Sequence, residues 1–261
     1  MELEEDYVIF GERLAEASGK IIRERFNKNR LVQYKDDGSP VTSADKDAET
    51  VMRDMIMVEY PNHGILGEEN KSWQIGSEYL WVLDPIDGTK NFASGFYNFG
   101  TLIALVIGGR FALGIINQPV LNQCWIGVAG RGTLFNGDLT ETRECSELGE
   151  AWMCSTTPNM FRGSKENGYK KLSSNVKHSI FGSDCIGYAM LSCGQIDIVC
   201  EAQLKPWDFA AHIPIIEGAG GMITDWSGKK LTLESSGEVL AAGSEELHKQ
   251  AVLALAQLLE N

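Results

Sequence analysis

The sequence predicts an α+β fold in which helices and β-sheets stack in separate layers. Two helical patterns come first, a run of strands with tight turns follows, and strands and helices alternate in the C-terminal half. Each element has an apolar face that must be buried against a neighbouring layer. The 261 residues, 43% of them hydrophobic, suffice for one large domain or two closely packed halves. We expect a single domain over residues 1–261, with halves of roughly 1–145 and 146–261.

The N-terminal half begins with two predicted helices. Apolar residues recur at roughly helical spacing over residues 7–26, and a polar stretch, KDDGSPVTSAD, then interrupts the pattern. The pattern resumes over residues 45–60, and Pro61 ends it. Ile65 and Leu66 indicate a short strand that runs into Gly67-Glu68-Glu69.

The middle of the chain is β-like. Residues 79–83 form a short apolar strand, which we expect Pro85 to end. Residues 100–107, 112–116 and 124–128 are typical of strands, and Gly-Gly, Gln-Pro and Gly-Arg-Gly turns separate the segments into a meander of hairpins. Residues from about 140 to 178 form a polar, mixed connection.

Strands and helices alternate after this connection. We expect a strand near Ile180, a helix over 186–193, a strand over 196–201, a helix from Asp208 and a strand over 222–225. An amphipathic helix over about 244–259 ends the chain.

The charge and composition exclude several classes of partner. The formal net charge is −13 without a basic patch, which argues against nucleic acid and anionic membranes. An acidic site for metal ions or for a positively charged substrate agrees with this balance. The acidic start has no signal-peptide pattern, no apolar run approaches about 20 residues, and the six cysteines lack zinc-ligand spacing. We therefore expect a cytoplasmic protein, with an organellar precursor left open.

Acidic residues from separate parts of the chain predict a metal site. Glu68 and Glu69 end a strand, Asp84 and Asp87 flank Pro85, and Asp208 stands at a helix start. Residues three apart on a straight strand face opposite ways, so the D-x-x-D pair needs a turn, which Pro85 supplies by ending strand pairing. Converging carboxylates need a cation between them, and hard oxygen ligands favour Mg²⁺ over zinc. Each element alone is also typical of a solvated loop or a helix cap.

The residues after Asp87 add a candidate phosphate site. The amides of Gly88 and Thr89 open a predicted helix through Lys90 and Asn91, and amides at such a position bind anions. The Thr89 hydroxyl and a Glu carboxylate would orient and deprotonate a metal-activated water. Together with the resemblance described next, these features indicate a phosphatase that hydrolyses a small phosphomonoester by direct attack of this water.

The motifs WVLDPIDGTKNF and WDFAAHIPIIEGAGG resemble the two signatures of the inositol-monophosphatase superfamily of Mg²⁺-dependent, lithium-sensitive phosphatases. The resemblance covers nearly the whole chain. It implies a five-layer αβαβα sandwich of the inositol monophosphatase / fructose-1,6-bisphosphatase type and two or three Mg²⁺ ions per site. Lithium inhibition is also implied, and similar proteins are commonly homodimers.

The resemblance assigns roles to individual residues. Glu68, Asp84 and the Ile86 carbonyl would hold one metal, and Asp84, Asp87 and Asp208 a second, with Glu68 near a weaker third. Thr89 and Glu68 would position the attacking water, with Asp45 in the same network and Lys35 in the same loop. The implied substrate contacts are Glu68, Ile86, Asp87, Gly88, Thr89, Asn91, Gly182, Ser183, Asp184, Glu201 and Asp208.

Within the superfamily the chain most resembles the histidinol-phosphate phosphatases of histidine biosynthesis, through segments such as GSDCIGYAMLSCGQIDIVCEAQLKPWDFAA. Asp184 stands where many inositol phosphatases have a small residue. A carboxylate there suits a substrate with an ammonium group and an imidazole, and Glu201 would add a second acceptor. Asp184 is also a candidate helix cap. His212 is interpreted as structural, and Phe92, Phe96, Tyr97 and Phe99 as core or subunit contacts.

Four alternatives stay open at this point. The first is a broad-specificity inositol-1-phosphate phosphatase, and the second a bisphosphate-nucleotide phosphatase, although this compact chain lacks the usual insertions. The third is a haloacid-dehalogenase-type enzyme, but its D-x-D-x-T spacing is one residue shorter, so we expect no covalent intermediate. The fourth is a non-catalytic partner protein, which the full set of ligands and the acidic charge disfavour.

Overall fold

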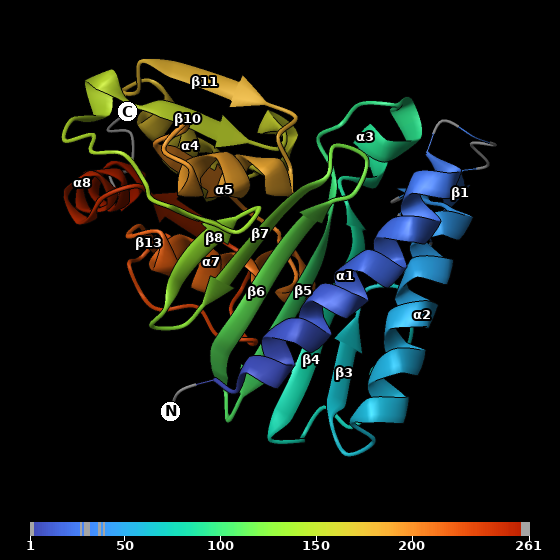
Figure 1. The fold of residues 1–261 in the computed structure, drawn as a ribbon. Coiled ribbons are helices and arrows are strands. Elements are labelled where there is room, and N and C mark those ends of the chain that lie inside the picture. Colours follow the sequence, from blue (N-terminus) through green and yellow to red (C-terminus); the bar gives the residue numbers. More distant parts are fainter. Residues whose placement is uncertain (1–2, 27, 29–31, 36–37, 39, 257–261) are drawn as a thin grey trace.

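The chain folds into five layers of helices and sheets (Figure 1). The computed structural model describes residues 3–26, 28, 32–35, 38 and 40–256. Helices α1 (Glu5–Arg25) and α2 (Ser43–Glu59) cover one face of a seven-stranded sheet. Helices α5 (Cys185–Ser192), α6 (Pro206–Phe209) and α7 (His212–Gly218) lie between this sheet and a five-stranded sheet, and α4 (Ser164–Ser173) and α8 (Glu245–Ala256) lie outside the second sheet. The αβαβα sandwich implied by the resemblance is confirmed.

The seven-stranded sheet is a meander in chain order, antiparallel except where β3 pairs with β4 in parallel. Every residue of strand β5 is buried, because helices cover both faces of the sheet there. The hairpins predicted from the turn residues are confirmed, and two further short strands, β8 and β9, extend them. The strands are β3 (Gly64–Gly67), β4 (Tyr79–Asp87), β5 (Gly100–Ile107), β6 (Arg110–Gln118), β7 (Gln123–Val128), β8 (Gly132–Phe135) and β9 (Asp138–Thr140).

The five-stranded sheet has the order β11-β10-β12-β14-β13. Its second strand, β10, and helix α4 lie within residues 140–178, which were predicted only as a polar, mixed connection, so neither element was predicted. Only three residues of β10 are buried, and so short an apolar stretch carries no clear period. The remaining elements of this half are β10 (Trp152–Ser155), β11 (His178–Phe181), β12 (Ile198–Glu201), β13 (Met222–Thr224), β14 (Val239–Ala242), η1 (Leu148–Glu150) and η2 (Pro158–Met160).

Two glycines let α7 pack directly on the first sheet. A Cβ atom at Gly114 would lie 2.0 Å from the Ala211 carbonyl oxygen, and one at Gly127 would lie 2.5 Å from the Ile215 backbone. The Thr133 hydroxyl adds a 2.7 Å hydrogen bond to the Ile215 carbonyl. This close contact places α6, and with it Asp208, beside the end of β4.

Smaller elements complete the fold. The short strands β1 (Gln33–Tyr34) and β2 (Pro40–Val41) pair with each other, and α3 (Thr89–Ser94) follows β4. The described part of α8 ends at Ala256, and the rest of the predicted terminal helix lies outside the described residues, as do Asp36, Asp37 and Ser39 of the polar stretch. None of the described helices combines the length and apolar content needed to cross a bilayer.

The aromatic residues near α3 divide into two groups. Phe92 and Phe99 pack against Phe26 in a buried cluster, as predicted for core residues. Phe96 and Tyr97 are exposed by 64% and 47%. The homodimer stays a prediction, and these two rings offer it an apolar surface.

Candidate active site

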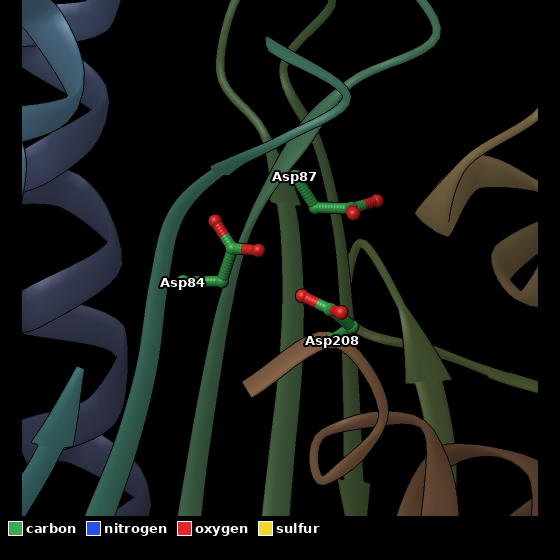
Figure 2. Close-up of side chains that lie close together, drawn as sticks. All are labelled: Asp84, Asp87 and Asp208. Atoms are coloured by element: carbon green, nitrogen blue, oxygen red, sulfur yellow. The ribbon is translucent and has the colours of Figure 1, made fainter. Parts of the chain in front are cut away.

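Three carboxylates converge at the end of the first sheet. Asp84 and Asp87 come from β4 and Asp208 from α6, and their ligand oxygens all lie within 4.8 Å of one another (Figure 2). Asp84 pairs with Leu102 and Asp87 with Gly100, so three steps along β4 match two along β5. This bulge turns both side chains toward one point.

The bulge corrects the predicted role of Pro85. Strand β4 does not end there but continues to Asp87, with Pro85 inside the irregular stretch. Proline has no N–H to donate, so it is tolerated where the ladder is interrupted. The Thr101 hydroxyl donates a 2.9 Å hydrogen bond to the Pro85 carbonyl and holds the bulge against β5.

Each of the three carboxylates is anchored through one oxygen. Asp84 accepts a 3.0 Å hydrogen bond from the Ile86 amide, and Asp87 a 2.6 Å bond from the Cys185 amide. Asp208 accepts a 2.7 Å bond from the Lys205 amide, so its predicted role at a helix start is also present. A backbone amide thus holds each of the three carboxylates in place.

Three closely spaced carboxylates need a positive charge beside them, and in this cluster Asp84 is buried while Asp87 and Asp208 are half-buried. Burial, and then repulsion by neighbouring carboxylates, raises the pKa of Asp84, Asp87 and Asp208 well above the usual value. Within the part of the chain that the structure describes, none of the three forms an ion pair with lysine, arginine or histidine. Three fixed oxygens without a partner cation fit a hard divalent metal ion.

Glu68 lines the same cavity but does not belong to the three-carboxylate cluster. Its carboxylate accepts a 2.7 Å hydrogen bond from the Lys35 ammonium, which also lies 2.6 Å from a Glu69 oxygen. The structure thus brings three of the four predicted carboxylate ligands together. Lys35, predicted only to lie in the same loop, supplies the positive charge beside the fourth.

Thr89 and Asp45, both predicted to belong to the water network, lie within hydrogen-bonding distance of each other. Gly88 precedes α3 with a φ of 84°, a left-handed conformation that favours glycine. The Thr89 hydroxyl lies 3.0 Å from the Ile86 carbonyl and 3.2 Å from an Asp45 oxygen, so its one proton can go to either acceptor. Asp45 is fully buried, and its other oxygen accepts from the amide and hydroxyl of Thr42 in a capping box.

Two further acidic residues, Asp184 and Glu201, line the same cavity as the carboxylate cluster. Asp184 accepts a 2.6 Å hydrogen bond from the Asn91 amide group, which also reaches the Gly182 carbonyl. Glu201, 2% exposed at the end of β12, accepts from the amide and hydroxyl of Thr156 and from the Tyr188 hydroxyl. Burial, followed by the charge of Glu201, raises the pKa of Asp184 to about 7.

The backbone of Asp184 corrects its candidate role as a helix cap. Asp184 precedes α5, but its side chain makes no capping hydrogen bond. Its φ of 45° and ψ of −142° lie in a region that non-glycine residues rarely adopt. The side chain is instead turned to Asn91. The neighbouring Ser183 hydroxyl is buried and has no hydrogen-bond partner among the described residues.

The cavity that joins these groups has a volume of about 410 Å³. Gly182 and Ser183, which precede Asp184, do not line the cavity. His212 does line it. The His212 ring is buried and stacks on Tyr188 at 4.0 Å, as the structural interpretation predicts. The lining residues are Glu68, Asp84, Ile86, Asp87, Gly88, Thr89, Lys90, Thr156, Met160, Asp184, Cys185, Glu201, Gln203, Leu204, Asp208 and His212.

Three residues that hold the site together are absent from the predicted set: Glu49, Thr156 and Tyr188. Thr156 and Tyr188 orient Glu201, and Glu49 accepts hydrogen bonds from the loop that carries Glu68. One signal for Glu49 is its place beside Ala48, Met52 and Ile56, among the core positions of α2. A charged residue there needs a buried partner.

The layered fold and the carboxylate cluster together define a metal-dependent phosphatase. The sequence matches the Inositol monophosphatase family over residues 3–260, and the chain belongs to this family. It is 46% identical over 259 residues to the bifunctional phosphatase IMPL2, chloroplastic, of Arabidopsis thaliana, covering 95% of this chain and 75% of that protein.

Two further relatives support the same placement. A histidinol-phosphatase of Chlorobaculum parvum is 32% identical over 230 residues, covering 87% of this chain and 89% of that protein. The structure of an inositol monophosphatase from Zymomonas mobilis superposes with a TM-score of 0.91 at 42% identity, covering 98% of this chain and all of that one, 100%.

Proposed function

We propose that this phosphatase hydrolyses L-histidinol phosphate to L-histidinol and phosphate with Mg²⁺. The observation that carries the proposal is the second acidic pair, Asp184 and Glu201, in the same cavity as the carboxylate cluster. A phosphate needs cations on one side of the cavity, and a cationic leaving group needs carboxylates on the other. One relative is a histidinol-phosphatase, which supports the substrate class, and another is a bifunctional phosphatase.

The residues present fit Mg²⁺, because the donor set is oxygen alone. Glu68, Asp84 and the Ile86 carbonyl would hold one ion, and Asp84, Asp87 and Asp208 a second. When bound, Mg²⁺ lowers the pKa of a coordinated water and neutralises negative charge on the phosphoryl oxygens.

Thr89 and Asp45 would orient the attacking water. While the Thr89 hydroxyl donates its proton to Asp45 or to the Ile86 carbonyl, its oxygen is left as an acceptor for a proton of the water. Glu68 would accept the proton that the water loses, since its carboxylate lines the same cavity as Thr89. Gly88 and Thr89 would contact the phosphate.

Asp184 would bind the ammonium group of the substrate. Its carboxylate is fixed by Asn91 through one oxygen, which leaves the other oxygen for a ligand. A backbone conformation such as that of Asp184 costs about 1–3 kcal/mol for a non-glycine residue. The strain lies in the backbone of Asp184, and no capping hydrogen bond of its side chain offsets it. We therefore interpret the Asp184 carboxylate as functional.

A binding experiment without turnover tests the proposal. In the presence of Mg²⁺ and inorganic phosphate, L-histidinol should raise the melting temperature and inhibit the enzyme, because it refills the leaving-group side of the cavity. Myo-inositol at the same concentration should do neither, since it has no cationic group for Asp184. A stronger effect of myo-inositol would reject L-histidinol phosphate as the preferred substrate.

Lithium should inhibit the enzyme when Mg²⁺ is present. Lithium is a small cation that can compete with Mg²⁺ for a binding site with few carboxylate ligands. The proposed site of Glu68, Asp84 and the Ile86 carbonyl is such a site. Activity measured against rising LiCl, with KCl at equal ionic strength as the control, should fall only with lithium. Equal rates in both salts at high concentration would contradict the proposed ligand set.

Inositol 1-phosphate is the second candidate substrate. Glu201 and Asp184 also accept hydrogen bonds from hydroxyl groups, so a polyol phosphate would find partners in the same cavity. Several relatives are inositol monophosphatases, which supports this candidate.

A further inference from the structure

Glu49 holds the loop that carries Glu68 without lining the active-site cavity. Glu49 is fully buried on α2, with 0% exposure. One of its oxygens accepts a 2.7 Å hydrogen bond from the Glu69 amide, and the other accepts two 3.1 Å bonds from the amide and side chain of Asn70. The two backbone amides that follow Glu68 therefore both donate to one buried carboxylate.

Gly67 leaves the space that this carboxylate occupies. A Cβ atom at Gly67 would lie 2.4 Å from one Glu49 oxygen and 2.8 Å from the other. The conformation of Gly67 does not explain the glycine, since its φ is not among the positive values of the chain. The need for glycine at the end of β3 thus comes from the carboxylate packed against it.

Arg53, one turn further along α2, also contacts this loop. One of its guanidinium nitrogens lies 3.4 Å from a Glu49 oxygen, and another donates a 2.8 Å hydrogen bond to the Lys71 carbonyl. The pair thus contacts three consecutive residues of the loop, from Glu69 to Lys71.

As a result, the backbone of Glu68 is held by hydrogen bonds at its own amide and at the next amide. Its own amide donates a 3.2 Å hydrogen bond to the Leu83 carbonyl of β4, and the next amide donates to Glu49. We propose that Glu49 is a positioning residue that holds the Glu68 carboxylate at the proper distance from Asp84 to share a divalent cation. It contacts neither the cation nor the substrate. The proposal rests on the proposed function only in that Glu68 binds a metal ion.

Glu49→Gln and Gly67→Ala test this role from opposite sides. In Glu49→Gln the shape is kept, but the new NH₂ group faces a backbone N–H, so at least one loop bond is lost. In Gly67→Ala no charge changes, but the new methyl group displaces the Glu49 carboxylate. Residues behind a metal ligand typically change metal affinity or activity about 10–100-fold.

The measurements are Mg²⁺ binding by calorimetry and the Mg²⁺ dependence of p-nitrophenyl phosphate hydrolysis. Both variants should need about 10-fold or more Mg²⁺ for half-saturation, with a reduced kcat and with KM for the ester at saturating Mg²⁺ changed less than about 3-fold. Asp197→Asn is the matched control. Asp197 is also buried, and it accepts hydrogen bonds from a backbone amide and from an arginine, but it lies outside the cavity. Its loss should lower the melting temperature without changing the affinity for Mg²⁺.

Lowered melting temperatures with unchanged Mg²⁺ affinity in both Glu49→Gln and Gly67→Ala would overturn the proposal and leave Glu49 a purely structural residue. The same Mg²⁺ shift in Asp197→Asn would overturn it too, because any buried defect would then suffice. A wild-type protein that prefers another phosphomonoester would reject the proposed substrate but would leave the Mg²⁺ shift as a valid test of Glu49.

Discussion

Replacing Asp87 with asparagine should reduce phosphate release by at least about 10³-fold, which corresponds to about 4 kcal/mol of transition-state stabilisation. Asparagine has the shape of aspartate and keeps an oxygen for the Cys185 amide, so the bulge of β4 should persist. The variant lacks the negative charge that completes the cluster with Asp84 and Asp208. The loss should therefore lie in the chemistry and not in folding.

Thermal melts of Asp87→Asn separate these two effects. Without metal, the variant should be at least as stable as the wild type, because one of three repelling carboxylates is gone. With Mg²⁺, the wild type should gain more in melting temperature than the variant. A variant that keeps a tenth of the wild-type activity would contradict the assignment of Asp87 as a metal ligand.

Asp184→Gly should separate stability from specificity. Glycine adopts the φ of 45° and ψ of −142° without the strain that aspartate bears there. Relief of about 1–3 kcal/mol, offset by about 0.5–1 kcal/mol for the greater freedom of glycine in the unfolded chain, should leave the protein equally or more stable. The kcat/KM for L-histidinol phosphate should nevertheless fall about 100-fold relative to that for a neutral phosphomonoester, since a charge-assisted contact is lost.

Asp184→Ala is the matched control for this experiment. Alanine removes the same carboxylate but keeps a Cβ atom in the strained conformation, so it should lose the specificity without the gain in stability. Kinetics on both esters and thermal melts of the two variants provide the comparison. Equal losses on the charged and the neutral ester would show that Asp184 is structural.

The general architecture was predictable because it depends on apolar periodicity and turn residues. The hairpins from β5 to β7 follow from apolar runs separated by Gly-Gly and Gln-Pro turns, and α1 and α2 from helical spacing. Strands β10 and β14 have four residues each and therefore give a weak signal, although length alone does not explain the miss, because β11 and β12 are equally short and were predicted. Neither was predicted.

The site was predictable where a motif is contiguous and less so where contacts are tertiary. The cluster of Asp84, Asp87 and Asp208 lies where the two signatures place it, although the turn between the first two is a bulge and not a strand end. No local pattern shows that Lys35 pairs with Glu68 or that Tyr188 holds Glu201, since these pairs depend on how separate elements pack. The strain at Asp184 is likewise visible only in the backbone angles.

The most direct test of this account is phosphate release from L-histidinol phosphate and inositol 1-phosphate, measured side by side with Mg²⁺ and with an EDTA control. The account predicts a higher kcat/KM for L-histidinol phosphate and loss of activity on both esters in EDTA. Preference for inositol 1-phosphate would keep the metal site and reject the proposed substrate. Activity that EDTA does not remove would contradict the assignment of Asp84, Asp87 and Asp208 to a catalytic metal.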